Sequence, residues 1–267
     1  MTHPDPFREI DRSADPAALV KALEERGRDA AQRRLRLGFL RAIPISRGDT
    51  VLEVGCGTGV VLRDLIPLVG RGGRVAGVDP SRAMVTAARR LCRGTGMNVR
   101  HGDGTKLPFT DGGFDVALAV TVLLHVVDPL AVVREMARVT RGGGRVAVQD
   151  QDFGTVAAAH PDRVLTDRIL DGVVHHIYEE PYSGRRLPTL LHEARLTRVR
   201  LRTDVFQDTT LTPYSQIFLE RRAANAVRFG IVDADTAKRW LDGFTAMARA
   251  GNFVLTMNYY GAVGIKS

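Results

Sequence analysis

The residues of this chain best suited to ligand chemistry stand where short apolar runs end. The first run, at 51–54, is followed by Gly-Cys-Gly-Thr-Gly at 55–59, a turn of small residues that lets a ligand approach the backbone. The second run ends at Asp79 and the third leads to Asp103. A carboxylate at such a place accepts hydrogen bonds from ribose hydroxyls or from an adenine amino group. Each feature also has a purely structural interpretation, as a strand-to-helix connection, a helix cap or a turn.

A dinucleotide site is disfavoured by the spacing of the glycines. The pattern Gly-x-Gly-x-x-Gly requires a third glycine where Val60 stands, and Gly59 comes one position too early. A fourth apolar run, 114–120, continues to His125, and backbone carbonyls at its end can meet a ligand ammonium group. Taken in order, the four strand ends describe a site for an adenosine that carries an amino acid.

The elements that must position these residues alternate between apolar runs and amphipathic segments. Strands are expected at 51–54, 74–78, 98–101, 114–120 and 145–149, and helices at 16–43, 60–69, 81–93 and 129–140. Beyond a less regular stretch at 150–183, we expect a helix at 187–194, a strand at 197–205, helices at 213–228 and 233–250, and a closing strand at 254–265. This alternation predicts a parallel sheet, with the ligand at the carboxyl ends of its strands.

The stretch from about Arg41 to Asp150 resembles the class I S-adenosylmethionine-dependent methyltransferases, in the type 11 branch that is similar to quinone-biosynthesis and natural-product enzymes. Two departures weaken a subfamily assignment: Leu124-His125 replaces a frequent His pair, and Glu193-Ala-Arg-Leu replaces acidic-Ala-Gly-Phe. The resemblance is carried by the motif Glu53-Val-Gly-Cys-Gly-Thr-Gly59, by Asp79, by Asp103, by Leu107-Pro108-Phe109 and by the run Val120 to His125.

The resemblance implies an α/β fold: a Rossmann-like seven-stranded, mostly parallel sheet with helices on both faces and a helical cap. The last two strands suit the antiparallel hairpin of that family. The expected organisation is an N-terminal helical segment at 1–45, a cofactor-binding core at 46–150, a cap segment at 151–183, and a C-terminal part of the core at 184–267 with inserted helices at 212–250.

The resemblance also implies S-adenosyl-L-methionine as the cofactor. The motif at 53–59 would cradle its methionine moiety, Asp79 would bind the ribose hydroxyls, and Asp103 the adenine amino group. The expected cofactor contacts are Glu53, Gly55, Cys56, Gly57, Thr58, Gly59, Asp79, Pro80, Ser81, Met84, Gly102, Asp103, Gly104, Val120, Thr121 and His125.

Methyl transfer from a sulfonium mainly requires positioning, and a neutral amine or phenol must also lose a proton to a base. The catalytic candidates are His125, Asp150 and His176, and the substrate-binding candidates are Asp152, Tyr178 and Tyr214. The alternatives are a buried histidine with a backbone bond, carboxylates that cap the next element, and tyrosines that pack in the core. His175 and His176 point about 100° apart on a helix, so only one of them can face a pocket. No set of metal ligands is evident.

Composition narrows the class of partner. The 267 residues include 44% hydrophobic residues and 2 Cys, which favours a folded cytoplasmic protein without a disulfide scaffold, and no apolar run approaches a bilayer span. The net charge of +8 raises the question of nucleic acid, but the arginines are dispersed along the chain. The exit of the fourth strand, Thr121 to Leu124, lacks the Asn/Asp-Pro-Pro-aromatic motif of base methylation, and neither Cys56 nor Cys92 fits a nucleophile. We expect a small-molecule acceptor and no nucleic acid or membrane partner; a homodimer stays open.

The function that these features favour is methyl transfer to an O, N or C atom of a small molecule, in natural-product biosynthesis, by an enzyme of class EC 2.1.1.-. One alternative is a methyltransferase-like cyclase that keeps the cofactor only structurally, since fold does not fix chemistry. An RNA methyltransferase is the weaker alternative. The intact cofactor motif favours the first function, and the sequence does not name the acceptor.

Overall fold

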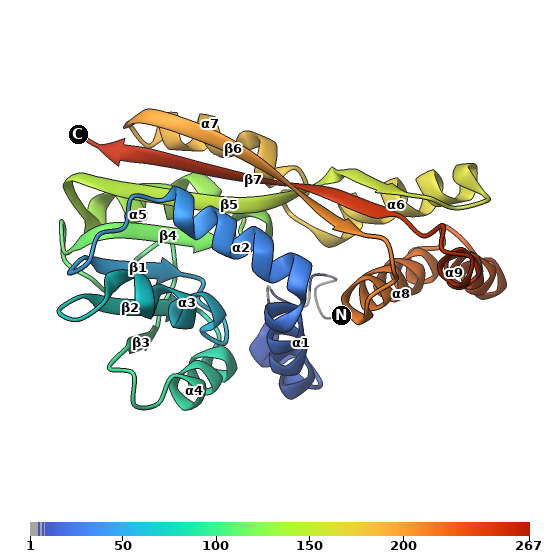
Figure 1. The fold of residues 1–267 in the computed structure, drawn as a ribbon, viewed down its shortest axis with the longest axis horizontal. Helices are drawn as coiled ribbons and strands as arrows, with labels where there is room; N and C mark the ends of the chain where they lie inside the picture. The colour runs from blue at the N-terminus through green and yellow to red at the C-terminus, as the bar shows by residue number, and fades with distance from the viewer. Residues whose placement is uncertain (1–4, 6, 8) are drawn as a thin grey trace.

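The computed structural model describes residues 5, 7 and 9–267, and its centre is one mixed sheet (Figure 1). The strand order is β3-β2-β1-β4-β5-β7-β6, with β1 to β5 parallel and β7 antiparallel to both neighbours. The predicted seven-stranded, mostly parallel sheet is therefore confirmed. Its strands are β1 (Thr50–Val54), β2 (Arg74–Asp79), β3 (Asn98–His101), β4 (Phe114–Val120), β5 (Thr140–Ala158), β6 (Leu196–Asp208) and β7 (Leu255–Lys266).

The helices cover both faces of the sheet and extend beyond one end of it. They are η1 (Ile10–Arg12), α1 (Pro16–Arg28), α2 (Ala30–Ala42), α3 (Val60–Val69), α4 (Arg82–Leu91), η2 (Leu123–His125), α5 (Pro129–Val139), α6 (Arg163–Ile177), α7 (Ser183–Glu193), α8 (Pro213–Arg228) and α9 (Ala234–Arg249). The single helix expected at 16–43 is wrong. The chain turns at Asp29, whose backbone N–H closes α1 on Glu25 and whose carboxylate accepts from the Gln32 N–H at 2.9 Å to cap α2.

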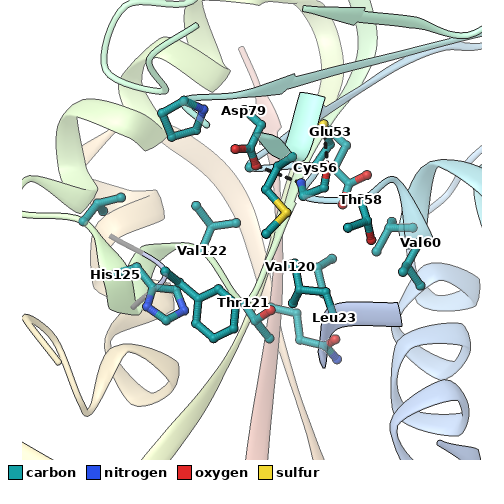
Figure 2. A pocket seen from close by; sticks show the side chains of 18 of the residues that line it. Leu23, Glu53, Cys56, Thr58, Val60, Asp79, Val120, Thr121, Val122 and His125 are labelled. Atoms are coloured by element: carbon teal, nitrogen blue, oxygen red, sulfur yellow. Dashed lines mark hydrogen bonds between the residues drawn. The ribbon is translucent and has the colours of Figure 1, made fainter. Parts of the chain in front are cut away.

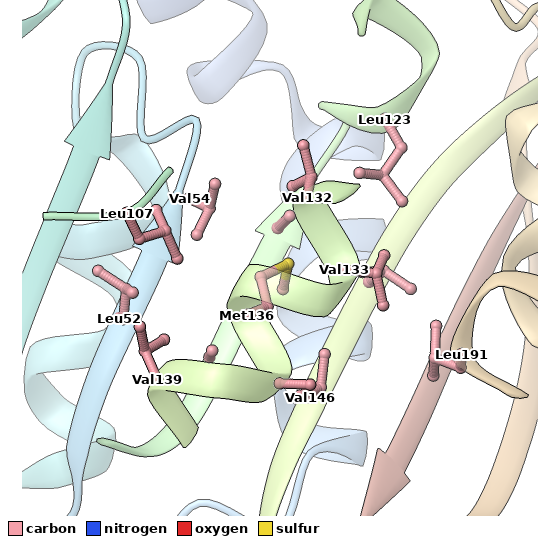
Figure 3. Close-up of a cluster of buried hydrophobic side chains, with 14 of the residues drawn as sticks. Leu52, Val54, Leu107, Leu123, Val132, Val133, Met136, Val139, Val146 and Leu191 are labelled. Carbon is pink, nitrogen blue, oxygen red and sulfur yellow. The ribbon is translucent and has the colours of Figure 1, made fainter. Parts of the chain in front are cut away.

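Two apolar layers hold the helices against the sheet. On one face, α5 and α7 pack over β1, β4 and β5, and Figure 3 shows Val132, Val133 and Met136 of α5 in one cluster with Leu52, Val146 and Leu191. On the other face, α2, α3 and α4 bury a second cluster. The residues of β4 from Val116 to Ala119 are almost fully buried, as the continuous apolar run predicted for a strand covered on both faces.

The long strands carry the helices α6, α8 and α9, together called the cap from here on, away from the rest of the sheet. β5 extends from 140 to 158, well beyond the expected 145–149, because β7 continues to pair with it as far as Ala158 and Leu255. The extended parts of β5 and β7 support α6, α8 and α9, which gather at one end of the molecule (Figure 1). Their shared core includes Trp240, Phe244 and Phe253.

Candidate active site

A cavity of about 490 Å³ lies at the carboxyl ends of β1, β2 and β4 (Figure 2). Every expected cofactor contact lines it except Gly59, Ser81, Gly102 and Gly104. Ser81 instead caps α4, where its hydroxyl accepts from the Met84 N–H at 3.2 Å. The parallel strands thus gather at one edge the residues that the sequence places far apart.

The glycine turn at the cavity is held by positive φ angles, which are 69° at Gly55, 51° at Gly57 and 80° at Gly59. A side chain on Gly55 would lie 2.5 Å from Val122, and one on Gly59 would lie 2.8 Å from Cys92. Gly57 differs, because its nearest neighbour would be the tip of Leu23 at 3.2 Å, on the cavity wall. Gly55 and Gly59 therefore serve close packing, and Gly57 borders the ligand space.

Asp79 ties this turn to the end of β2. Its carboxylate accepts from the Gly57 N–H at 2.8 Å and from the Ser81 N–H at 2.9 Å, so the structural role expected for it is present in addition to its place in the cavity wall. Burial raises the pKa of Asp79 above its ordinary value. Asp103 is exposed at the far end of the cavity and accepts from the Thr105 N–H at 2.8 Å.

Glu53 is the most isolated carboxylate of the cavity. It is 2% exposed, and its Oε2 has no hydrogen-bond partner. Burial raises the pKa of Glu53 well above its ordinary value, and the nearby charge of Asp79 adds to the effect. The Nε2 of Gln149, also on the cavity wall, is a buried donor without a partner. The buried Oε2 of Glu53, an acceptor without a hydrogen bond, is suited to a cationic ligand group.

Arg26, which the sequence analysis did not select, supplies the opposite charge. Its guanidinium donates to Thr121 Oγ1 at 3.3 Å, Gln151 Oε1 at 3.2 Å, Tyr259 Oη at 3.3 Å and Gln32 Oε1 at 3.3 Å. All four acceptors are neutral, and within the described part of the chain no carboxylate forms an ion pair with Arg26. The cavity thus offers an unpaired acceptor and an unneutralised cation, which together match the ammonium and carboxylate of an amino acid.

The N-terminal segment, meaning the described residues between Asp5 and the end of α1, forms one wall of the cavity. No sequence motif indicated this wall. Phe7, Ile10 and Leu23 line the cavity, in a cluster with Met84. The segment is fastened to the core by Asp11, whose carboxylate accepts from Ser81 Oγ at 2.6 Å and from the first two backbone N–H groups of α4 at 2.8 and 3.1 Å. The only sequence signal was the apolar spacing of a helix, which does not reveal what the helix covers.

His125 is the one acceptor-side candidate that lines the cavity. It stands at the end of η2, and its Nδ1 lies 2.5 Å from Oδ2 of Asp5. Its ring lies 5.6 Å from that of Phe7 and 5.9 Å from that of Tyr178, measured between centroids. Figure 2 shows His125 across the cavity from Asp79 and Glu53.

The two acidic candidates of β5 have structural partners outside the cavity lining. Asp150, 1% exposed, accepts from the Leu124 N–H at 3.2 Å and from Ser183 Oγ at 2.8 Å, while its Oδ1 has no partner. Burial raises the pKa of Asp150 to about 7. Asp152 forms an ion pair with Arg185. Both carboxylates hold the strand exit in place, and neither faces the cavity.

The remaining candidates belong to the cap. His176 is exposed on α6 and stacks on Phe229 at 4.6 Å, and Tyr214 meets Phe206 edge-on at 5.3 Å. Tyr178 stacks on Phe153 at 4.3 Å and so places its ring beside His125. No residue of α6, α8 or α9 is among those that line the cavity, whereas Phe7, Ile10 and Leu23 of the N-terminal part do line it. Over the described residues, no cluster of three metal-ligating side chains was found, and no helix is long and apolar enough to span a membrane.

Comparison with known proteins identifies the family. A family model described as "Methyltransferase domain" matches residues 52–148, the segment that builds the glycine turn and β1 to β5. Methyltransferase GfsG of Streptomyces halstedii is 32% identical over 181 residues, which cover 64% of this chain and 60% of that protein. This chain belongs to the class I S-adenosylmethionine-dependent methyltransferases.

Two further matches define the extent of this methyltransferase. An uncharacterised 37.1 kDa protein in a transposon of Streptomyces fradiae is 32% identical over 247 residues, 91% of this chain and 70% of that protein. The chain thus spans 60% to 70% of these two relatives. Phosphoethanolamine N-methyltransferase 2 of Haemonchus contortus, solved with S-adenosyl-L-methionine, has a TM-score of 0.62 at 14% identity, covering 97% of this chain and 60% of that one. The last match shows a shared fold alone.

The cofactor of this family is S-adenosylmethionine, and the cavity fits it. The cofactor carries a ribose, an adenine, an ammonium and a carboxylate group. The cavity presents carboxylates at two strand ends, an orphaned buried oxygen on Glu53 and the cation of Arg26. The acceptor of Glu53 therefore complements the ammonium group of the cofactor, and the cation of Arg26 complements its carboxylate.

Proposed function

We propose that this methyltransferase transfers the methyl group of S-adenosylmethionine to an O, N or C atom of a small molecule, as a step in natural-product biosynthesis. The observation that carries the proposal is the composition of the cavity wall. Its polar groups suffice for the cofactor, and the side near His125 is mainly apolar, with Phe7, Val122, Val126 and Val127 beside a single carboxylate, Asp128. Such a wall suits a small, partly apolar acceptor better than a charged polymer.

In this proposal the cofactor is held by the residues already placed. Asp79 accepts from the ribose hydroxyls and Asp103 from the adenine amino group. Glu53 receives the ammonium group, and Arg26 receives the carboxylate. The bound cofactor would supply its methyl group to an acceptor held in the same cavity, where His125 lies.

The acceptor is expected to enter beside His125 and Tyr178, where the core meets the cap. The aromatic surface of Phe153 and Tyr178 continues to Arg222, a guanidinium 2% exposed that stacks over Phe153, Tyr178 and Phe218. In this proposal these rings form a buried aromatic layer beside His125, which favours a planar or lipophilic acceptor. A cytoplasmic location and a homodimer remain part of the proposal.

Incubation of the purified protein with methyl-labelled S-adenosylmethionine tests this function. The acceptors are a panel of phenols, amines and quinols together with a small-molecule extract of the host, and RNA is tested in parallel. We expect label in a small organic product and S-adenosylhomocysteine in equal amount. Label in RNA would exclude the small-molecule assignment. A product formed from the extract without label or S-adenosylhomocysteine would instead support the cyclase alternative.

A further inference from the structure

The contact between Asp5 and His125 joins the N-terminal segment to the acceptor side of the cavity. Oδ2 of Asp5 lies 2.5 Å from Nδ1 of His125, while Oδ1 accepts from the Phe7 N–H at 3.0 Å. Asp5 is fully buried and His125 is 18% exposed. The carboxylate is therefore held in a fixed orientation by the turn in which it stands.

An ionised carboxylate at Nδ1 accepts a hydrogen bond and cannot donate one. A neutral His125 in this contact therefore carries its proton on Nδ1, and Nε2 keeps a free lone pair. Among the described residues, no hydrogen-bond partner of Nε2 is found, although the ring lines the cavity. This arrangement of a base oriented by a third group is the one that activates acceptors in other enzyme classes.

We propose that Asp5 is a positioning residue that fixes the tautomer of His125, so that Nε2 of this histidine serves as the general base. The inference rests on the proposed methyl transfer. In that reaction the acceptor's proton passes to Nε2 of His125, the acceptor's electron pair forms the bond to the methyl carbon, and the sulfur keeps the pair of the broken bond. The proton later leaves to water.

The other groups near His125 are consistent with this role. Asp150, behind η2, uses one oxygen for the backbone of Leu124, and its other oxygen has no hydrogen-bond partner among the described residues. Tyr178 presents its ring at 5.9 Å, with the Arg222 cation stacked on its far side. Asp5 is thus the group that meets Nδ1 directly.

The segment that carries Asp5 is also part of the cavity wall. Phe7 and Ile10 close the cavity beside His125, and Asp11 fastens the same segment to the start of α4. The same segment therefore contributes both to the wall of the cavity and to the orientation of His125.

The test is the tautomer of His125, read from the long-range proton–nitrogen spectrum of the full chain labelled with ¹⁵N-histidine. The sample is saturated with S-adenosylhomocysteine in alkaline buffer, and His125→Gln assigns the signal. We expect the Nδ1–H tautomer in the wild type and loss of that preference in Asp5→Asn and Asp5→Ala. The matched control is Glu9→Gln, since Glu9 is on the same segment but pairs with Arg12.

An Nε2–H tautomer in the wild type, or an unchanged tautomer in Asp5→Asn, would overturn the inference. With an acceptor from the panel, Asp5→Asn should lower kcat about tenfold or more without changing the affinity for S-adenosylhomocysteine, and Asp5→Glu should restore part of it. Equal kcat in wild type and Asp5→Asn would also overturn it. If no acceptor is methylated, the proposed function fails, while the tautomer still decides the role of Asp5.

Discussion

At the scale of single residues, the site contains two groups that the protein satisfies only in part, one in its hydrogen bonding and one in its charge. Glu53 has an oxygen without a hydrogen bond, and Arg26 has only neutral acceptors around its charge. Unsatisfied buried groups lower stability, so their presence in a cavity indicates that a ligand completes them. Each of the two can be tested separately, because they would meet different parts of the cofactor.

Replacement of Glu53 by Gln tests the ammonium contact. Burial raises the pKa of Glu53, and a cationic group bound beside it would lower that pKa, so binding should be accompanied by proton release in the wild type. Calorimetry of S-adenosylhomocysteine binding in two buffers of different ionisation enthalpy measures this release. We expect a buffer-dependent enthalpy that disappears in Glu53→Gln and persists in Glu25→Gln, a surface change on α1. Absence of buffer dependence in the wild type would contradict the assignment.

Replacement of Arg26 by Gln tests the carboxylate contact. A hydrogen bond between charged groups contributes about 1.5–3 kcal/mol, so the affinity for S-adenosylhomocysteine should fall about 10- to 100-fold. The affinity for 5′-methylthioadenosine, which lacks the amino acid, should not change. Arg28→Gln, an exposed change on the same helix, serves as the control. Equal losses for both ligands would mean that Arg26 acts by holding the wall together.

At the scale of elements, one short turn and one helix pair make the cavity. The turn between β1 and α3 brings the backbone to the ligand, and α1 closes the opposite side because Asp29 bends the chain before α2. The turn can adopt its observed conformation because the three residues with positive φ are glycines. A side chain added at Gly57 should therefore weaken ligand binding more than it weakens folding.

Gly57→Val should abolish cofactor binding and leave the chain folded. The branched side chain would enter the space next to Leu23, and the positive φ adds a strain of about 1–2 kcal/mol. Gly48→Val is the matched control, because Gly48 also has a positive φ, of 94°, with nothing within 4 Å of the added atom. Calorimetry and thermal unfolding of both variants should show similar destabilisation but binding in Gly48→Val alone. Collapse of Gly57→Val would show that the turn is mainly structural.

At the scale of the whole molecule, the buried carboxyl of Asp150 makes the free energy of unfolding depend on pH. This carboxyl lies under η2, between β5 and α7, and burial raises its pKa to about 7. A raised folded-state pKa means that the native protein holds a proton which the unfolded chain releases from about pH 4. Stability from this group is therefore greatest in acid and declines as pH rises from about 4 to about 7.

Asp150→Asn should remove that decline, since an amide keeps the acceptor for Leu124 and Ser183 and has no charge to bury. Urea unfolding of the two proteins at several pH values measures the difference. We expect the variant to gain stability relative to the wild type progressively from about pH 4 to about pH 7 and to keep a constant advantage above it. Asp167→Asn, an exposed carboxyl on α6, should show no such trend. A parallel pH dependence in Asp150→Asn would refute the buried-carboxyl account.

The sequence by itself determined the sheet and the cofactor edge. Apolar runs of strand length alternate with helical periodicity between residues 50 and 150, and right-handed crossovers allow few topologies for such a pattern. The same rule predicted that the turn at 55–59, Asp79 and Asp103 would meet at one edge, and they line one cavity. These features depend on local pattern and chain direction, which a linear sequence contains.

The tertiary structure alone decided which segment closes the cavity. The N-terminal segment and the cap are both amphipathic, and periodicity shows that a helix has an apolar face but not what that face covers. The contacts of Arg26 with Gln151 and Tyr259, and of Asp5 with His125, join residues separated by more than a hundred positions. The tertiary structure also decided the partners of Asp152 and Asp150, which are Arg185 and Ser183. A buried carboxylate pairs with the donors that the packed fold places near it, and these donors are distant in the sequence.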